Sequence, residues 1–456
     1  MNARKTHWLI AILCVTGLFV RPSLAVPGDL DGDGRIDSAD YALFIGCRTD
    51  PGAGHVAPDC TAGDFDLDRD VDLADFARFQ SLFGFSLCEP AWLRDSSTVP
   101  AMDNEVHCLK VFDDGSGPAL YAGGTFTSVG GQPMSRIAKW DGSTWSPLAG
   151  GIGGSGAIIR VGALAVYDDG RGEALYAGGS FGTAGTGPAL GVAKWDGSTW
   201  SPLGGGTNSS VLALAVYDDG GGPALYAGGH FLRAGWQTVN YIAKWDGANW
   251  SAVGMGMNEM VRSVAAFDDG SGPALYAGGS FTVAGGVPAN YIARWDGTNW
   301  SPVGGGVDGA VRALLVYDDG RGPALFAAGN FAIAGGVAAN RVARWDGAGW
   351  SALGSGVFPE IRALAVYDDG GGEALYVGGN FANGGGVGAR NVAKWAGAAW
   401  SPLTGGTNNP VYALAAYGAE SSADLFVGGL FTVAGDEPAS YLAKWSRPTP
   451  PCPQDP

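Results

Sequence analysis

Residues 311–356 read VRALLVYDDGRGPALFAAGNFAIAGGVAANRVARWDGAGWSALGSG, and this stretch is one copy of a unit that the chain repeats. Seven such units lie between Val106 and Trp445. One tryptophan per unit marks their register: Trp140, Trp195, Trp245, Trp295, Trp345, Trp395 and Trp445. The first interval between them is 55 residues and the others are 50. A fixed period of this length indicates an array of similar supersecondary units.

Each unit contains four short segments with the composition of β-strands. In the quoted copy they are residues 311–317, 324–331, 341–345 and 350–353. The first two are separated by an Asp-Asp-Gly turn, the last two by Asp346-Gly347, a strong hairpin signal. Four strands per unit predict a mainly β fold, a seven-bladed β-propeller of four-stranded blades. A stacked solenoid is the alternative, and it would need helices or shorter β-coils.

Two repeated features are interpreted as structural. The Asp-Asp-Gly turns recur in six units. They could bind cations, but Asp bonding to its own backbone and Gly at positive φ make hairpin turns the better interpretation. The repeated tryptophans could stack on sugars, but one position in every unit favours packing between blades.

The seventh unit stops at Trp445-Ser446 and lacks its fourth strand. We expect residues 91–94, followed by residues 96–102, to supply that strand and close the ring, so that the propeller spans residues 89–446. Cys88 then precedes the closing strand and Cys452 follows the last third strand. A disulfide between them would replace the missing turn and stabilise the fold by roughly 4–5 kcal/mol. Cys108 falls inside a first strand and is expected to be a buried free thiol.

The first 25 residues have the pattern of a signal peptide. A cationic start precedes an apolar run from Trp8 to Val20, and Ser23-Leu24-Ala25 offers a cleavage site after Ala25. An uncleaved anchor is the alternative. We therefore expect a secreted or cell-surface protein with no membrane span after cleavage, in which disulfides form and an odd cysteine is left over. The formal net charge of −17 argues against a nucleic-acid partner, because phosphate binding needs a clustered cationic surface.

Two acidic segments precede the repeats, at residues 29–40 and 64–75. Their carboxylates occupy positions 1, 3, 5, 9 and 12 of a twelve-residue calcium loop, and a short apolar helix is expected after each loop. The expected ligands are Asp29, Asp31, Asp33, Arg35 through its carbonyl, Asp37 and Asp40, then Asp64, Asp66, Asp68, Asp70, Asp72 and Asp75. Arg69 replaces the glycine of the sharp turn, so we expect the second of two Ca²⁺ sites to be weaker. The alternatives are solvated acidic turns, or Mg²⁺, which takes fewer protein ligands.

Residues 26–88 resemble a type I dockerin, and are still more similar to the dockerin-like modules of planctomycete secreted proteins, which carry cysteines between their two loops. The resemblance implies a small α-helical, calcium-loaded module, a disulfide between Cys47 and Cys60, and docking to a cohesin-like partner. Dockerins often carry a Ser-Thr pair at loop positions 10 and 11, where this chain has Ser38-Ala39 and Leu73-Ala74. This departure argues against ordinary cellulosomal cohesin binding and leaves a different envelope partner open.

The repeats resemble kelch repeats. A Gly-Gly doublet ends the second strand, as at Gly228-Gly229, an aromatic-Asp pair ends the third, as at Trp245-Asp246, and Trp250 begins the fourth. The units are even more similar to the repeats of fungal cortical polarity-marker proteins. The resemblance implies a binding scaffold, since kelch propellers mostly bind partners. The copper ligands of galactose oxidase, a catalytic propeller of this kind, have no counterpart in this sequence.

Residues that break the repeat gather in two sets of loops expected on one face. They are Arg160, His230, Arg233, Trp236, Gln237, Met255, Met257, Glu259, Arg262, Asp308, Glu360, Asn383, Asn408, Asp436 and Glu437. The densest group, His230, Arg233 and Trp236, is a candidate ligand face because a ring and two polar groups can stack on and hydrogen-bond a glycan. A partly exposed loop is the alternative.

We expect a non-catalytic binding or scaffold protein, whose propeller recognises a protein or glycan while the calcium module docks it to an extracellular partner. The alternative is a polysaccharide-active enzyme, a glycoside hydrolase or lyase, with Glu259, Asp308 and Glu360 as its carboxylates. A redox role for the odd cysteine is a third hypothesis. Only three histidines follow the signal peptide, which disfavours histidine-based catalysis and a transition-metal site.

Overall fold

The computed structural model describes residues 90–93, 101–156, 158–419 and 423–447, which belong to one compact unit. The predicted signal peptide, the two calcium loops with their ligands, and Cys47, Cys60, Cys88 and Cys452 lie outside these residues. The described part of the chain is all-β and contains no helix. It accordingly offers no helix long and apolar enough to cross a membrane.

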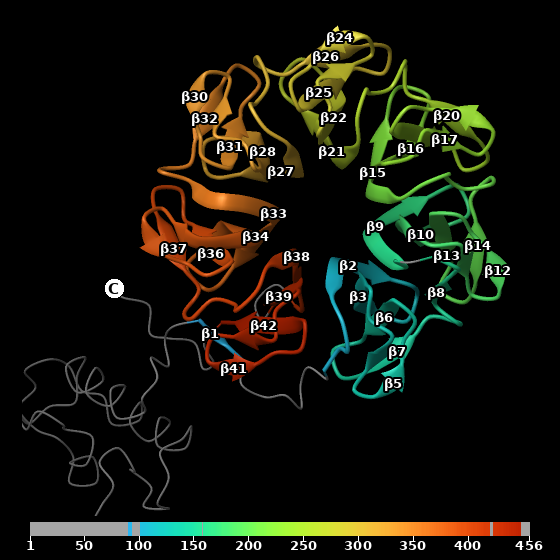
Figure 1. Cartoon of the computed structure of the whole chain (residues 1–456), viewed down its shortest axis with the longest axis horizontal. Coiled ribbons are helices and arrows are strands. Elements are labelled where there is room, and N and C mark those ends of the chain that lie inside the picture. The colour runs from blue at the N-terminus through green and yellow to red at the C-terminus, as the bar shows by residue number, and fades with distance from the viewer. Residues whose placement is uncertain (1–89, 94–100, 157, 420–422, 448–456) are drawn as a thin grey trace, which may run out of the picture. The chain divides into compact units, whose positions relative to one another are not determined.

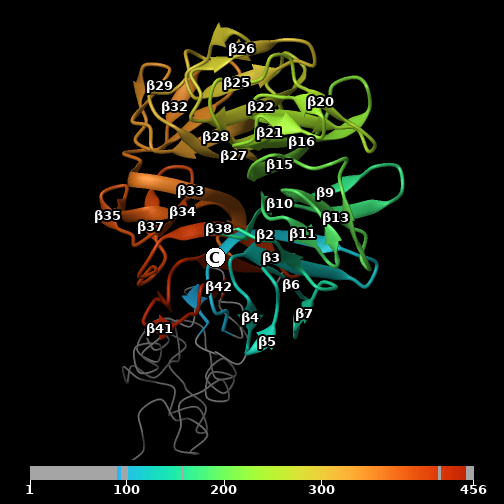
Figure 2. The ribbon, with the colours of Figure 1, turned by 45° about the vertical axis from the view of Figure 1, so that its right-hand side comes forward.

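Seven antiparallel sheets, each with a core of four strands, make up most of the described chain. Figure 1 shows them around a central axis, as in a β-propeller, and Figure 2 shows the same ring turned by 45°. We number these blades one to seven by their first strand. The first strands face the middle of the ring, and each contacts the first strands of both neighbouring blades.

Strands at the same position in the seven blades cover equivalent parts of the repeat. The first strands are β2 (Val106–Asp113), β9 (Arg160–Asp168), β15 (Val211–Asp218), β21 (Val261–Asp268), β27 (Val311–Asp318), β33 (Val357–Asp368) and β38 (Val411–Tyr417). The second strands are β3 (Pro118–Gly124), β10 (Glu173–Ser180), β16 (Pro223–Gly229), β22 (Pro273–Gly279), β28 (Pro323–Gly329), β34 (Glu373–Gly384) and β39 (Asp424–Gly429). The third strands are β6 (Ile137–Trp140), β13 (Val192–Trp195), β19 (Ile242–Trp245), β25 (Ile292–Trp295), β31 (Val342–Trp345), β36 (Val392–Trp395) and β42 (Leu442–Ser446). The fourth strands are β7 (Trp145–Pro147), β14 (Trp200–Pro202), β20 (Trp250–Ala252), β26 (Trp300–Pro302), β32 (Trp350–Ala352), β37 (Trp400–Pro402) and β1 (Ala91–Trp92).

The fourth strand of blade seven comes from the start of the described chain. In β1, Ala91 pairs with Ser446 and Trp92 pairs with Trp445. Trp92 also donates its indole N–H to the Thr404 carbonyl of blade six at 2.8 Å. Between blades seven and one, the Tyr417 hydroxyl donates to the Pro118 carbonyl at 3.1 Å. These contacts join the two ends of the repeat array.

The repeated tryptophans pack inside and between blades. The tryptophan that ends each third strand lies against the one that begins the fourth, with ring centroids 5.2–5.4 Å apart. In every blade except blade one, the second ring also donates its N–H to a carbonyl of the preceding blade, as when Trp250 donates to the Leu203 carbonyl at 3.0 Å. Because most of these rings are buried against each other and against the neighbouring blade, the packing interpretation is confirmed.

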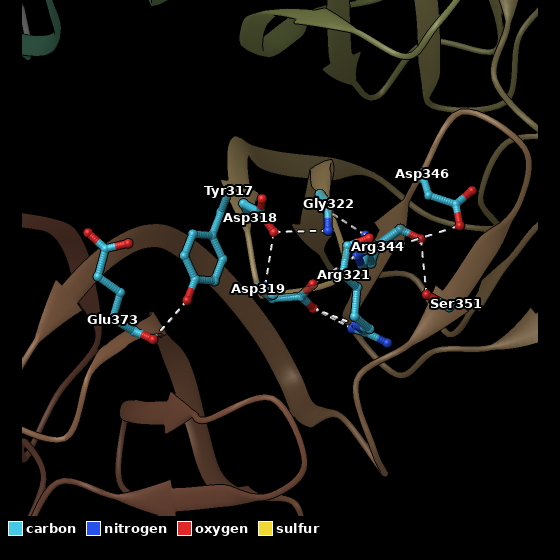
Figure 3. A network of polar contacts seen from close by, with 10 residues as sticks. Tyr317, Asp318, Asp319, Arg321, Gly322, Arg344, Asp346, Ser351 and Glu373 are labelled. Carbon is cyan, nitrogen blue, oxygen red and sulfur yellow. Dashed lines mark hydrogen bonds and ion pairs between the residues drawn. The ribbon is translucent and has the colours of Figure 1, made fainter.

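The Asp-Asp-Gly turns are hairpin turns, as expected. In blade five, Asp318 accepts bonds from the backbone N–H groups of Gly320 and Gly322 (Figure 3). The next residue, Asp319, pairs with Arg344 on the third strand at 3.4 Å. Blade two repeats the design with Asp169 and Lys194, 2.6 Å apart. Both carboxylates of the turn are therefore used by the fold itself.

The structure adds small elements that the sequence pattern did not predict. The loop between second and third strands carries a two-residue hairpin in six blades and one extra strand in blade six. These elements are β4 (Ser128–Val129), β5 (Gln132–Pro133), β11 (Thr183–Ala184), β12 (Gly187–Pro188), β17 (Arg233–Ala234), β18 (Gln237–Thr238), β23 (Val283–Ala284), β24 (Val287–Pro288), β29 (Ile333–Ala334), β30 (Val337–Ala338), β35 (Val387–Gly388), β40 (Val433–Ala434) and β41 (Glu437–Pro438). In blade two, β8 (Ile152–Gly153) pairs with β11 as a third strand. The second strand of blade five also ends at Gly329, two residues earlier than expected.

Candidate functional site

Every first strand contains a β-bulge at the same place. In β21, for example, Val261 pairs with Gly279 and Ser263 pairs with Gly278, so Arg262 between them is unpaired. The equivalent unpaired residues are His107, Gly162, Leu212, Arg262, Arg312, Arg362 and Tyr412. A bulge re-aims the side chain of its extra residue, and here it turns seven side-chain positions toward the middle of the ring.

The Gly-Gly doublet of the repeat explains why the bulge fits. A Cβ on Gly229 would lie 2.2 Å from the Ser210 carbonyl, which immediately precedes the bulged strand. A Cβ on Gly228 would lie 2.5 Å from Val261 Cγ1 of the next blade. The doublet therefore lets both the bulged backbone and the neighbouring blade approach closely.

The unpaired residues, together with Arg160, line an open cavity of about 140 Å³, which we name the arginine cavity. Its lining comes from the first strands of all seven blades: His107, Arg160, Gly162, Leu212, Arg262, Arg312, Arg362 and Tyr412. Four of these eight residues are arginines. In a chain of net charge −17, this concentration of positive charge stands out.

One buried carboxylate organises two of the arginines. Glu360 lies at the start of the bulged segment of β33, with its side chain 12% exposed. Its Oε1 pairs with Arg312 Nε of blade five, and its Oε2 accepts a 2.7 Å bond from Arg362 Nε. Both guanidiniums are thus held by their Nε edges. A guanidinium carries five donors, so such pairing leaves its terminal N–H groups for another acceptor.

The other two arginines have no carboxylate partner among the described residues. Arg262 donates from Nε to the Ser280 hydroxyl at 3.2 Å. Its burial and the nearby Arg312 lower its pKa, which is the response expected of a cation held among cations. Arg160 lies beside Gly162, which contributes no side chain at the bulge of blade two. Its backbone pairs with Ser180, and its guanidinium has no ion-pair or hydrogen-bond partner in the described ranges. The cavity therefore holds more positive charge than Glu360 neutralises.

A stack of rings forms the side of the cavity between blades six and one. The Arg362 guanidinium lies 5.0 Å from the centre of the Tyr412 ring, and the His107 ring stacks on Tyr412 at 5.0 Å. Burial, with Arg160 and Arg362 nearby, lowers the pKa of His107 to about 4. Glu105 Oε2 lies 2.8 Å from His107 Nε2 and acts in the opposite direction. Burial has the larger effect, so the imidazole is neutral at pH 7.

This arrangement is suited to holding an anion. Guanidiniums recognise carboxylate, sulfate and phosphate groups through paired N–H donors, and such charge-assisted bonds are about twice as strong as neutral ones. No group of three or more His, Cys, Asp or Glu side chains in the described chain could hold a metal ion. The cavity therefore presents arginine side chains that can bind an anion, and not a set of metal ligands.

The predicted ligand face lies elsewhere, in the hairpin loop of blade three. Trp236 is 88% exposed at the tip between β17 and β18. His230 stacks on Tyr241, 6.4 Å away, and not on Trp236. The described contacts do not join His230, Arg233 and Trp236 into one cluster, and none of the three lines the arginine cavity.

The three candidate carboxylates are not brought together as a catalytic pair. Asp308 accepts backbone bonds from Ala332 and Ile333 at 2.7 and 2.8 Å. Glu259 accepts a bond from the N–H of Met260 at 2.9 Å. Glu360 reaches the arginine cavity, where two arginines engage it.

Cys108 is a free thiol in β2, as expected, but it is half-buried rather than buried. Its sulfur lies 3.7 Å from the Val161 carbonyl, and burial raises its pKa to about 12. A thiol that ionises so reluctantly is a poor nucleophile, which removes support from a redox role.

Sequence reasoning missed Arg312, Arg362, His107 and Tyr412 as site residues. They lie inside expected strands, where alternation alone assigns no special role. A signal was present in the aligned repeats: the residue after the first aliphatic residue of each unit reads His, Gly, Leu, Arg, Arg, Arg and Tyr from blade one to blade seven. That position varies in chemistry while its neighbours repeat.

Comparison with known proteins gives no family assignment. No protein-family model matches the sequence, and no curated protein matches it. Among solved structures, it is similar to the extracellular domain of the one-component system BT4673 from B. thetaiotaomicron, with a TM-score of 0.47 and 12% identity. A second structure, titled as the extracellular domain of the hybrid two-component system BT4673, gives a TM-score of 0.44 and 13% identity. Each match covers 76% of this chain and 39% of the solved chain, so this chain spans well under half of those proteins.

Proposed function

We propose that this chain is an exported, non-catalytic binding protein, a kelch-like propeller that holds the anionic group of its ligand in the arginine cavity. The observation that carries the proposal is the set of four arginines around a single buried carboxylate, three of them at positions where a bulge turns side chains inward. Partly desolvating four cations beside one buried carboxylate is unfavourable by itself. An external anion would relieve that imbalance.

The experiment is calorimetric titration of the full chain with inorganic sulfate and with acetate, at low ionic strength. Arg160→Gln and Arg262→Gln remove cations that have no carboxylate partner, so the fold should tolerate both. Losing a charge-assisted bond of roughly 1.5–3 kcal/mol should weaken binding about 10- to 100-fold.

Arg171→Gln is the matched control, because Arg171 is an exposed residue of the blade-two turn and lies outside the cavity. It should bind sulfate as the parent does. Absence of saturable binding by either anion, or unchanged affinity in both cavity variants, would overturn the proposal.

The dockerin-like module is proposed to load two Ca²⁺ ions, at residues 29–40 and 64–75, and to dock the protein to a cohesin-like or other envelope partner. The spacing of carboxylates supports this proposal. The polysaccharide-active alternative has less support, because Asp308 and Glu259 bond to loop backbone rather than face a shared space.

A further inference from the structure

Blade two departs from the other blades beside the arginine cavity. The repeat interval between Trp140 and Trp195 is five residues longer than the others, and the extra residues fall between Gly153 and Arg160. In blades three, four, five and seven, the residue equivalent to Gly153 is Asn208, Asn258, Asp308 or Asn408, which caps two loop N–H groups. Gly153 cannot make this cap, and β8 pairs with β11 there instead.

A second departure removes a side chain at the start of the third strand. Gly191 has φ +70°. At the same left-handed position the other blades carry Arg136, Tyr241, Tyr291, Arg341, Asn391 and Tyr441. Holding a non-glycine residue in this conformation costs of order 1 kcal/mol, and six blades accept that cost. Blade two lacks the side chain that they keep.

These departures coincide with a second cavity of about 310 Å³, which we name the blade-two groove. Its lining includes Ser155 and Ile158 of the insertion, Ser180 and Gly191 of blade two, and Ser209 and Ser210 of blade three. The groove borders the arginine cavity. Ile159 and Ser210, which immediately precede β9 and β15, line the groove, while Arg160 and Leu212, at the starts of these strands, line the arginine cavity. The Gly162 bulge, which leaves room for Arg160, belongs to the same blade.

The groove has a different chemistry from its neighbour. Its lining contains no charged residue, and it combines serine hydroxyls and glycine backbone with apolar surface from Ile158, which is 66% exposed, and Leu190, which is 51% exposed. Hydroxyls both donate and accept hydrogen bonds, as sugar hydroxyls do. Apolar patches between them suit the C–H faces of a sugar ring. Peptides are usually held at an exposed sheet edge or by side-chain pockets, and this lining comes mainly from loops.

We propose that the ligand is an acidic saccharide, whose charged group lies in the arginine cavity and whose hydroxylated rings extend into the blade-two groove. This inference rests on the proposed anion-binding function and names the ligand class for it. Carboxylate and sulfate substituents share the required chemistry, so both sources are tested.

The test titrates the full chain with trigalacturonic acid, its methyl-esterified form, a sulfated disaccharide, triglutamate and inorganic sulfate. At least one acidic saccharide should bind ten times or more tightly than inorganic sulfate, and the methyl ester should bind at least ten times more weakly than the free acid. The more tightly bound saccharide identifies carboxylate or sulfate as the natural group.

Two variants fill the groove with side chains that other blades carry. Ser180→Leu copies Leu430 of blade seven. Gly191→Asn copies Asn391 of blade six, whose amide donates to the Thr407 carbonyl beside a Thr-Asn segment like Thr207-Asn208. Each should weaken the acidic saccharide at least fivefold and leave inorganic sulfate unchanged. The control is Asn330→Leu, which places leucine at the equivalent position of blade five, away from the groove. This variant should bind like the parent.

The outcomes separate the two proposals. If sulfate fails to bind at all, the proposed function falls. If sulfate binds but no acidic saccharide binds more tightly, or both groove variants bind saccharide like the parent, only this inference is overturned. Tighter binding of triglutamate, lost in Ser180→Leu, would replace the saccharide by an acidic peptide and also overturn it.

Discussion

Replacing Glu360 by Gln should change stability and anion affinity in opposite directions. The carboxylate holds Arg312 and Arg362 together, so removing its charge leaves two half-buried cations side by side. Removing one partner of a fully buried pair costs roughly 3–5 kcal/mol. The Arg362 side chain is 33% exposed, and glutamine can still accept one hydrogen bond. We therefore expect a loss of about 1–2 kcal/mol in the free energy of unfolding.

Anion binding should become tighter in the same variant. Glu360 repels any anion that enters the cavity, and at a separation of about 7 Å and an effective dielectric constant of about 20 that repulsion is ~2 kcal/mol for each negative charge on the anion. Solvent in the cavity screens part of it, so we expect Kd for sulfate to fall about tenfold. Sulfate at a hundred times its Kd should add about 2.7 kcal/mol and more than restore the lost stability.

The assay is urea denaturation of Glu360→Gln with and without sulfate, together with calorimetric titration. Glu373→Gln is the control, because Glu373 is an exposed carboxylate at the start of β34 and should change neither quantity. Weaker or unchanged sulfate binding in Glu360→Gln would refute the view that Glu360 competes with the ligand. It would mean that the carboxylate mainly positions the arginines.

Three further predictions follow from the fold, one histidine and the calcium loops. Trp92→Ala should cost about 3–5 kcal/mol in urea denaturation, and more than Trp145→Ala, whose ring is less buried; equal losses would refute a special role for the closing strand. His107 has a lowered pKa of about 4, so its contribution to the free energy of unfolding is complete above about pH 6.5. That contribution falls by at most ~3 kcal/mol as the pH drops toward 4, and Glu105 reduces this loss. His107→Phe should remove most of this pH dependence of the free energy of unfolding between about pH 6.5 and pH 4. An unchanged dependence would refute the lowered pKa of His107. A calcium chelator should unfold residues 28–88 and leave the propeller transition in place, as followed by calorimetry; absence of calcium binding would refute the module.

The sequence predicted the propeller-like sheets well because their determinants are local. Trp245, Asp246-Gly247 and Trp250 lie within six residues, and they mark a third strand, a tight turn and a fourth strand without reference to the rest of the chain. The closing strand was predictable because the seventh unit has a third strand, which ends near Trp445, but no fourth strand after it. Two-residue hairpins such as β17 and β18 were missed, because Arg233-Ala234 and Gln237-Thr238 are too short to show alternation.

The arginine cavity could not be predicted in the same way, because it depends on register. Arg262 was noted as a residue that breaks the repeat, but Arg312 and Arg362 look like ordinary positions of an alternating strand. Only the bulge decides that these side chains turn inward, and a bulge is set by pairing with a second strand. A long polar residue at a single recurrent position of an otherwise apolar strand would have been the signal to follow.

The asymmetry of the cavity constrains how a ligand lies in it. A ring of seven identical residues would favour a ligand on the axis, equally distant from all blades. Here Arg262, Arg312 and Arg362 come from adjacent blades, whereas Tyr412 and His107 occupy the next two positions and Gly162 leaves a gap in blade two. Arg160 stands at that gap, in the one described blade that has both an insertion and a glycine at the left-handed position. An anion bridging the arginines of blades four to six and Arg160 would therefore point the rest of its molecule toward the blade-two groove.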